Sequence, residues 1–122
     1  MNGYKGLQVY QRGYEAAKAT YRMTEGFPKE ERYGIVDQMK RASLSIPLNI
    51  AEGYSKQESN AEFKRYLRMA IGSANEMTVL IDFAKDMGYI KEEQHRKAMN
   101  EYQEIGKMLR VFIKRVEERT TT

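Results

Sequence analysis

Four long stretches of the sequence repeat apolar residues at alternating intervals of three and four. This spacing places the apolar side chains on one face of an α-helix, where they pack against neighbouring helices. The third stretch is the most regular, since its seven apolar positions follow the alternation strictly from Phe63 to Ala84. No comparable stretch has the period of two that a half-buried strand requires. The sequence therefore predicts an all-α protein.

Turn-forming residues separate these stretches. Pro28 ends the first, because it cannot continue a helix and restricts the residue before it. Ser59 can cap the third helix, with Glu62 completing a capping box, and Gly88 ends that helix. The short connections favour an antiparallel up-down-up-down four-helix bundle that spans the chain as one domain. The expected helices are at about residues 6–25, 29–54, 59–87 and 91–118.

Pro47 lies inside the second apolar stretch. It removes one backbone donor and crowds the preceding turn. The apolar spacing keeps its phase from Ile46 to Ile50. We therefore expect one second helix that is kinked at Pro47.

The second helix also carries the motif Ser-Ile-Pro-Leu-Asn-Ile-Ala-Glu-Gly at residues 45–53. Together with Glu62-Phe63 and Gly88-Tyr89-Ile90, this motif resembles a bacterial family of four-helix-bundle proteins. These proteins are encoded by intervening sequences in 23S ribosomal RNA genes. The resemblance covers the chain from about Leu7 to Leu109 and implies the same fold.

The resemblance also carries implications for partners. The family is similar to the accessory variability determinant of diversity-generating retroelements, a pentameric bundle that binds RNA and a reverse transcriptase through a basic surface. The resemblance therefore implies a homo-oligomer, specifically a pentamer. It also implies RNA or DNA as a partner. A reverse transcriptase is the implied protein partner.

Basic residues are concentrated in a few segments of this mildly basic chain, whose net charge is +4. In an up-down-up-down bundle, both termini and the connection between the second and third helices lie at one end. This end collects basic residues, whereas the opposite end collects acidic ones such as Glu25, Asp82 and Glu92. A basic end suits phosphate contacts. The candidate nucleic-acid-binding residues are Lys56, Lys64, Arg65, Arg68, Lys114 and Arg115.

The alternative interpretation is an ordinary solvated surface, because helix C-termini favour basic residues. That explanation suits Lys114 and Arg115 near the end of the fourth helix. It does not suit Lys64, Arg65 and Arg68, which lie in the first half of the third helix.

On the first helix, the predicted core stripe runs through Leu7, Tyr10, Tyr14, Ala17, Tyr21 and Thr24. Two helices have apolar residues beside their core stripe. A helix with two apolar faces lies deep in a bundle or touches another subunit. A bundle this small does not need both faces, so we expect these residues at an oligomer interface. They are Val9, Ala16 and Met23 on the first helix and Tyr66 and Met69 on the third.

Polar residues line one face of the second helix. Glu52 with Arg41 or Asn49 could form a buried polar network that fixes the kink at Pro47. The alternative for this face is ligand binding.

The inventory of chemically active residues argues against an enzyme. The chain has no cysteine and one histidine, His95, whereas a di-iron bundle needs two Glu-x-x-His elements. We expect no metal site, no cofactor and no catalytic residue. Residues 1–10 lack the apolar core of a signal peptide, and no stretch has the ~20 apolar residues of a membrane span, so we expect a cytoplasmic protein without a membrane partner.

Three functions agree with these features. The first is a non-enzymatic RNA-binding accessory protein that presents basic residues from an oligomer. The second is an adaptor that binds a partner enzyme such as a reverse transcriptase. The third is the product of a selfish insertion without a host task.

Overall fold

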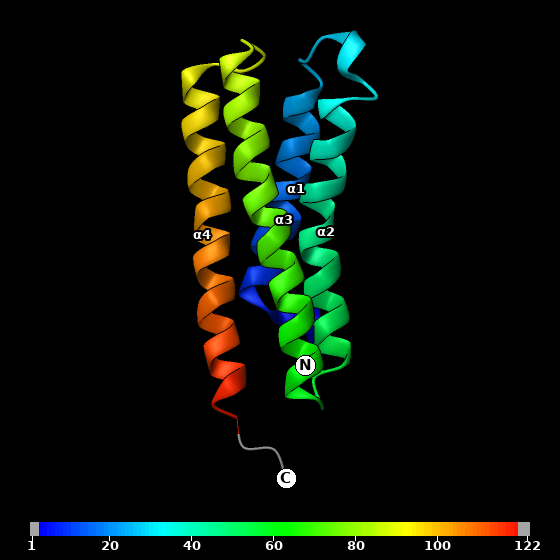
Figure 1. Cartoon of the computed structure of the whole chain (residues 1–122), viewed down its shortest axis with the longest axis vertical. Coiled ribbons are helices and arrows are strands. Elements are labelled where there is room, and N and C mark those ends of the chain that lie inside the picture. Colours follow the sequence, from blue (N-terminus) through cyan, green and yellow to red (C-terminus); the bar gives the residue numbers. More distant parts are fainter. Residues whose placement is uncertain (1–2, 120–122) are drawn as a thin grey trace.

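The four apolar stretches form four α-helices in the computed structural model, which describes residues 3–119. Consecutive helices run in opposite directions, and no strand occurs among the described residues (Figure 1). The predicted all-α, up-down-up-down four-helix bundle is therefore confirmed. The elements are η1 (Gly3–Gly6), α1 (Gln8–Thr24), η2 (Lys29–Glu31), α2 (Ile35–Ser55), α3 (Asn60–Asp86) and α4 (Glu92–Glu117).

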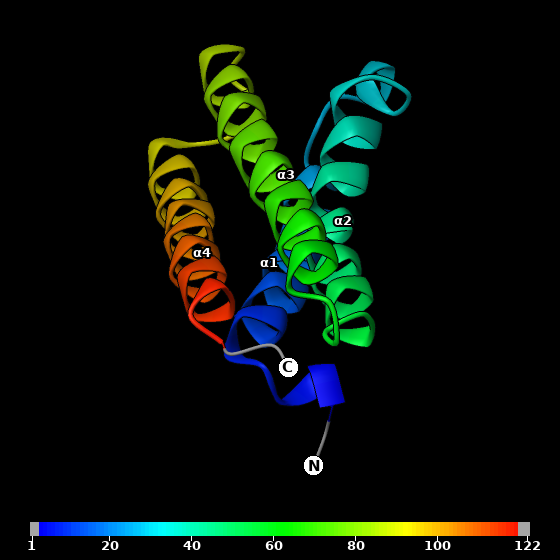
Figure 2. The same ribbon diagram turned by 60° about the horizontal axis from the view of Figure 1, so that its bottom comes forward.

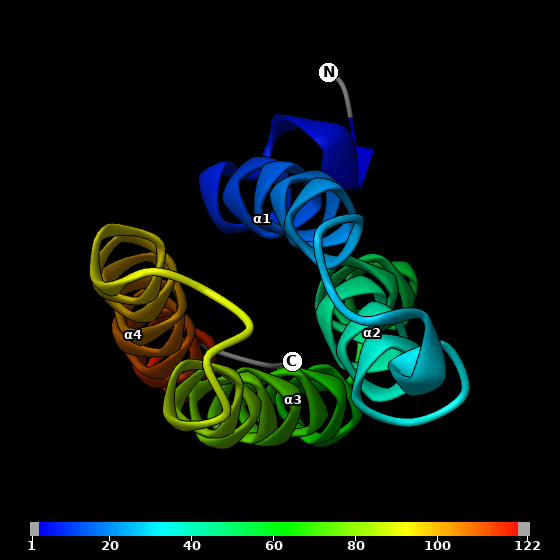
Figure 3. The same cartoon turned by 90° about the horizontal axis from the view of Figure 1, so that it is seen from above.

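The core runs along the axis of the bundle, and its best-buried side chains come from α2, α3 and α4. Ile46, Leu67 and Ile105 are fully buried. α3 packs extensively on both α2 and α4, whereas α1 packs mainly on α2 and contacts α4 much less. Viewed from above, α1 and α4 are accordingly the most widely separated neighbours (Figure 3). The bundle is thus least tightly closed between its first and last helices.

Local signals in the sequence set the two ends of α3. At its start, the Ser59 hydroxyl accepts a hydrogen bond from the Glu62 backbone N–H at 3.1 Å, which is half of the predicted capping box. At its end, Gly88 adopts a left-handed conformation with φ +78°. This conformation allows the Tyr89 N–H to reach the Ala84 carbonyl at 2.8 Å. Gly88 therefore ends the helix as predicted.

α2 differs from the prediction at its start and is continuous at its middle. It begins at Ile35 and not near residue 29, because Gly34 is not helical, with φ −108° and ψ −116°. Residues 29–31 form the separate turn η2. Pro47 lies within the unbroken helix, and the kink expected there stays a prediction.

The buried face of α1 agrees only in part with the predicted one, since Ala17 and Thr24 of the predicted stripe are buried and Tyr14 and Tyr21 are not. Its small residues, among them Ala16, Ala17 and Thr20, face the core, whereas Tyr14 and Tyr21 are 45% and 39% exposed. Small side chains let the helix backbone lie close to its neighbours, and the large rings remain at the edge of the contact. The lysine ammonium groups of Lys18 and Lys40 lie 5.4 and 5.0 Å from the centres of the Tyr14 and Tyr21 rings, respectively.

This arrangement corrects part of the predicted oligomer interface. Val9 and Ala16 are only 4% and 5% exposed within a single chain, so they belong to the bundle's own core and cannot contact another subunit. Met23 is half-buried. On α3, Tyr66 is half-buried and Met69 is 46% exposed. Their proposed contact with another subunit stays a prediction.

None of the helices in residues 3–119 has the length and apolar character needed to cross a membrane.

Candidate nucleic-acid interface

One end of the bundle holds the α2–α3 connection and the first and last described residues, and we call it the terminal end (Figures 1 and 2). The segments 52–68 and 107–119 form its α2, α3 and α4 portions. They contain nine basic and five acidic residues, an excess equal to the chain's whole net charge of +4. The positive character of the protein is therefore concentrated at the terminal end.

The opposite end is not acidic, contrary to the prediction. Residues 20–42 and 77–100, which make up this half of the bundle, contain nine basic and eight acidic residues. Basic residues such as Lys85 and Arg96 pair there with Glu92 and Glu93. The charge asymmetry of the molecule thus comes from the excess at the terminal end alone.

The α2–α3 connection brings two basic side chains to one aromatic ring. Gly53 makes the close crossing possible, because a Cβ atom there would lie 2.9 Å from the Cβ of Tyr66. The Tyr66 ring centre lies 4.4 Å from Cζ of Arg65 and 6.0 Å from Nζ of Lys56. Cations over a ring face are held electrostatically, so Lys56 and Arg65 converge on Tyr66.

The end of α4 is fastened to the start of α3 by hydrogen bonds. The Arg119 guanidinium donates to the Asn60 side-chain oxygen at 3.1 Å and to the Gln57 carbonyl at 2.6 Å. The Asn60 amide in turn donates to the Val116 carbonyl at 2.9 Å. These contacts place the basic residues of α3 and α4 side by side.

Four of the six predicted phosphate-binding residues are already paired with carboxylates. Lys64 and Arg68 share Glu117 across the α3–α4 contact, with N–O distances of 3.5 and 3.9 Å. Within their own helices, Arg65 pairs with Glu62 at 3.2 Å and Lys56 pairs with Glu52 at 3.3 Å. The hydrogen bond from Arg65 is the main reason that the pKa of Glu62 is lowered, and the same bond raises the pKa of Arg65.

The other two predicted residues, Lys114 and Arg115, belong to a larger group on α4. Lys107, Arg110, Lys114 and Arg115 are all exposed, and none forms an ion pair within residues 3–119. The sequence-based prediction missed Lys107 and Arg110, although Lys107, Arg110 and Lys114 follow one another at intervals of three and four, which places them on one helix face. We call these four residues the α4 basic face.

The predicted polar network on α2 does not form. The Arg41 side chain is 80% exposed and pairs with Asp37 at 3.3 Å, one turn earlier. The Asn49 amide donates to the Ser45 carbonyl at 2.8 Å, and Glu52 is exposed and pairs with Lys56. Each side chain thus finds a partner within its own helix or just after it. The distance along the helix from Arg41 to Glu52, about 16 Å, keeps them apart.

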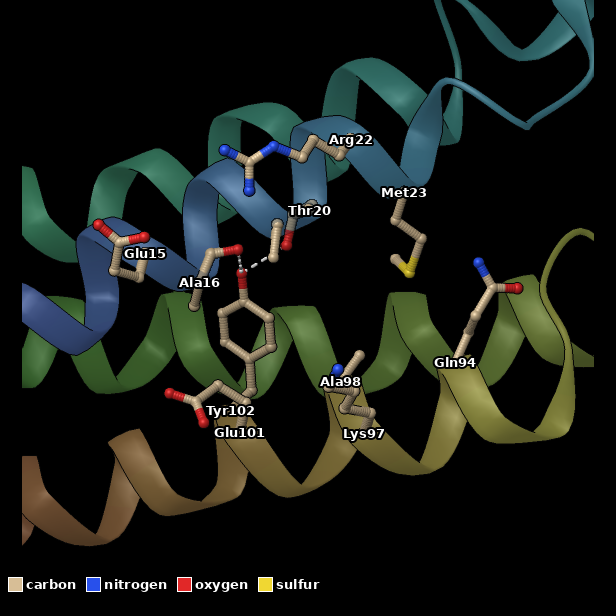
Figure 4. Close-up of a pocket in the computed structure, with 11 residues that line it drawn as sticks. Glu15, Ala16, Thr20, Arg22, Met23, Gln94, Lys97, Ala98, Glu101 and Tyr102 are labelled. Carbon is tan, nitrogen blue, oxygen red and sulfur yellow. Dashed lines mark hydrogen bonds between the residues drawn. The ribbon is translucent and has the colours of Figure 1, made fainter.

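A cleft with a volume of ≈ 680 Å³ lies in the loose α1–α4 contact (Figure 4). Tyr102 reaches across it from α4, and its hydroxyl donates to the Ala16 carbonyl at 3.0 Å. The same hydroxyl lies 2.6 Å from the Thr20 hydroxyl. Burial is the main reason that the pKa of Tyr102 is raised to about 12. These hydrogen bonds join α4 to α1 where the two helices make few other contacts, so the role of Tyr102 is structural.

His95 lies away from the terminal end. Its Nε2 atom is 2.8 Å from Oδ1 of Asp82, between α4 and α3. Within residues 3–119, no group of three or more histidine, aspartate or glutamate side chains is placed to hold a metal ion.

The fold and the charge distribution define a four-helix bundle with one basic end, and comparison with known proteins gives its family. The model of the 23S rRNA-intervening sequence protein family matches residues 5–111, so the chain belongs to that family. No curated protein matches the chain.

A crystal structure shows the same fold in a similar protein. It is of a protein of unknown function from the S23 ribosomal protein family of Bacteroides thetaiotaomicron VPI-5482. The two share 28% sequence identity with a TM-score of 0.79, over 87% of this chain and 95% of that chain.

Proposed function

We propose that this protein is a non-enzymatic accessory protein that binds nucleic acid, with RNA favoured, through the terminal end. The observation that carries the proposal is the concentration of charge: segments 52–68 and 107–119 hold nine basic and five acidic residues. Phosphate contacts supply most of the sequence-independent affinity of a protein for nucleic acid. A compact basic end is the surface such contacts require.

RNA is favoured over DNA by family membership. The family takes its name from intervening sequences of 23S rRNA. Segments 52–68 and 107–119 supply a surface with the charge that such binding requires.

We further propose that the protein acts as a homo-oligomer, a pentamer by its resemblance to the accessory proteins of diversity-generating retroelements. Symmetric copies would present several basic ends to one RNA, so modest affinity per subunit would combine into strong binding. The remaining candidates for subunit contacts are the exposed Met69 and the half-buried Tyr66 on α3 and the half-buried Met23 on α1.

A second candidate function is a protein adaptor, with a reverse transcriptase as the proposed partner. It is favoured by a stripe of exposed apolar residues near the C-terminal end of α3. Val79, Phe83 and Met87 are 67%, 50% and 51% exposed and follow one another at intervals of four. Large exposed apolar side chains on one helix face are typical of protein contacts.

Affinity capture with defined partners separates the two functions. The tagged protein is incubated with labelled RNA and with a purified reverse transcriptase, at low and at high salt. RNA binding predicts capture of RNA that high salt abolishes. The adaptor function predicts capture of the enzyme that survives both nuclease and high salt. Absence of RNA capture at low salt would exclude the first function.

A further inference from the structure

Eight of the nine basic residues in segments 52–68 and 107–119 fall into two groups that differ in whether a carboxylate already neutralises them, and the ninth, Arg119, binds Asn60 and Gln57. Lys56, Lys64, Arg65 and Arg68 each have a carboxylate partner within 3.9 Å. The α4 basic face has no such partner among the described residues. The two groups contain the same number of charges, which makes them directly comparable.

The geometry of α4 aims its basic face outward. At 100° per residue, Lys107, Arg110 and Lys114 fall within about 60° of one another around the helix, and Arg115 lies about 80° from Lys107 on its other side. Their side chains are exposed, whereas the Lys64 side chain is only 22% exposed. Two nearby carboxylates of α4 are paired with residues of other helices. Glu101 binds Arg12 at 2.8 Å, and Glu117 binds Lys64 and Arg68 of α3. Glu104 forms no ion pair with the α4 basic face.

A paired cation is a poor phosphate ligand for a physical reason. Before it can neutralise a phosphate, it must leave its carboxylate or bring that negative charge close to the phosphate. Either event offsets part of the Coulomb attraction and of the counterion release that drives binding. An unpaired exposed cation incurs neither cost.

An apolar cleft adjoins the α4 basic face. It has a volume of ≈ 500 Å³, lies between the start of α1 and α4, and includes Val111, which is 51% exposed. Lys107 and Arg115 line it together with the carboxylate of Glu104 and the amide of Gln8. Leu7 and Phe112 are among its apolar lining residues. A single-stranded nucleic acid can turn an unstacked base toward such a cleft while its phosphates contact the cations, and a duplex cannot.

We infer that the α4 basic face, and not the paired cations of α2 and α3, makes the main phosphate contacts, and that its ligand is single-stranded RNA. This inference rests on the proposed function, since it names the residues and the form of RNA that the terminal end binds. Lys107, Arg110, Lys114 and Arg115 hold the backbone, and the adjoining cleft accepts a base.

The test compares two variants with equal changes in net charge. In one, Lys107, Arg110, Lys114 and Arg115 are changed to Gln. In the matched control, Lys56, Lys64, Arg65 and Arg68 are changed to Gln, so both chains fall from +4 to zero. Binding of a labelled, unstructured single-stranded RNA and of the same strand annealed to its complement is measured by anisotropy across a salt series.

Four lost contacts lower the slope of log affinity against log salt by about 3 for single-stranded RNA, since each contributes about 0.7. Between 50 and 200 mM salt, the ratio of wild-type to α4-variant affinity therefore changes by about 50-fold. In the control variant, the slope decreases by less than about a third of the decrease in the α4 variant. Wild-type protein binds the single strand more tightly than the duplex.

Two results overturn the inference while leaving the proposed function intact. They are a control variant that loses as much slope as the α4 variant, and a duplex bound as tightly as the single strand. If the wild-type protein binds no RNA at low salt, both the inference and the proposed function are overturned. Circular dichroism checks folding, and if a fourfold variant does not fold, the pair Lys107→Gln/Arg110→Gln is compared with Lys56→Gln/Arg65→Gln.

Discussion

Removing the carboxylate of Glu117 should strengthen RNA binding. Its Oε2 atom lies 3.5 Å from Nζ of Lys64 and 3.9 Å from Nη2 of Arg68, so one carboxylate holds two cations of the terminal end. In Glu117→Gln the local negative charge is gone and both cations become available to phosphates. If both then contact single-stranded RNA, the salt slope steepens by about 1.4 and the affinity at 0.1 M salt rises by as much as about 25-fold.

Glu118→Gln is the matched control for this change. It removes the same charge from the adjacent residue, which is exposed and forms no ion pair within residues 3–119. It should change the salt slope by less than about 0.7. Exposed ion pairs contribute about 0–1 kcal/mol, so both variants should keep nearly the wild-type melting temperature. Equal gains in the two variants, measured by anisotropy across a salt series, would show that net charge and not pairing limits binding.

The remaining predictions concern stability and are read by thermal or urea unfolding. Gly53→Ala should destabilise the fold by about 1–3 kcal/mol, because the new methyl group would lie 2.9 Å from the Cβ of Tyr66. Gly72→Ala, with nothing within 4 Å, should instead stabilise it by about 0.5–1 kcal/mol; a loss of stability there would contradict the exposed helical position. Tyr102→Phe should cost about 1–3 kcal/mol, since the buried Thr20 hydroxyl and Ala16 carbonyl lose a partner. Because the pKa of Tyr102 is raised to about 12, the unfolded chain loses this proton first, and stability should fall between pH 10 and 12 by up to about 1.4 kcal/mol per pH unit in wild type, a component that Tyr102→Phe lacks.

The regular spacing of apolar residues was sufficient to predict the fold. Positions such as Leu67, Met77 and Ile81 are buried where the alternation of three and four placed them. The end of α3 also followed from a local signal, because Gly88 supplies the left-handed conformation that closes the helix. Such features depend on residues close together in the sequence, which a single chain displays directly.

The orientation of α1 could not be read in the same way. Its two apolar stripes differ by one residue, about 100° around the helix, so both face partly toward the bundle. Which stripe is buried depends on how closely α1 approaches α2, and small residues such as Ala16 and Thr20 permit the closer contact. Tyr14 and Tyr21 were therefore expected in the core and lie at its edge.

The candidate site shows the same limit. The sequence identified the terminal end, and it could have revealed the pairs Lys56–Glu52 and Arg65–Glu62, which lie one helical turn apart. The sharing of Glu117 by Lys64 and Arg68 depends on the packing of α4 against α3 and has no local signature. The sequence alone therefore does not distinguish a cation that is paired across two helices from one that is unpaired, and Lys107 and Arg110 were overlooked.

RNA binding by the terminal end is tested first by titrating wild-type protein against labelled single-stranded RNA across a salt series. Light scattering in the same buffer gives the mass of the assembly. We expect submicromolar binding at low salt by an oligomer, with a slope of log affinity against log salt of about −3 or steeper. A folded oligomer that leaves the RNA free at the lowest salt would exclude RNA binding and would favour the protein adaptor.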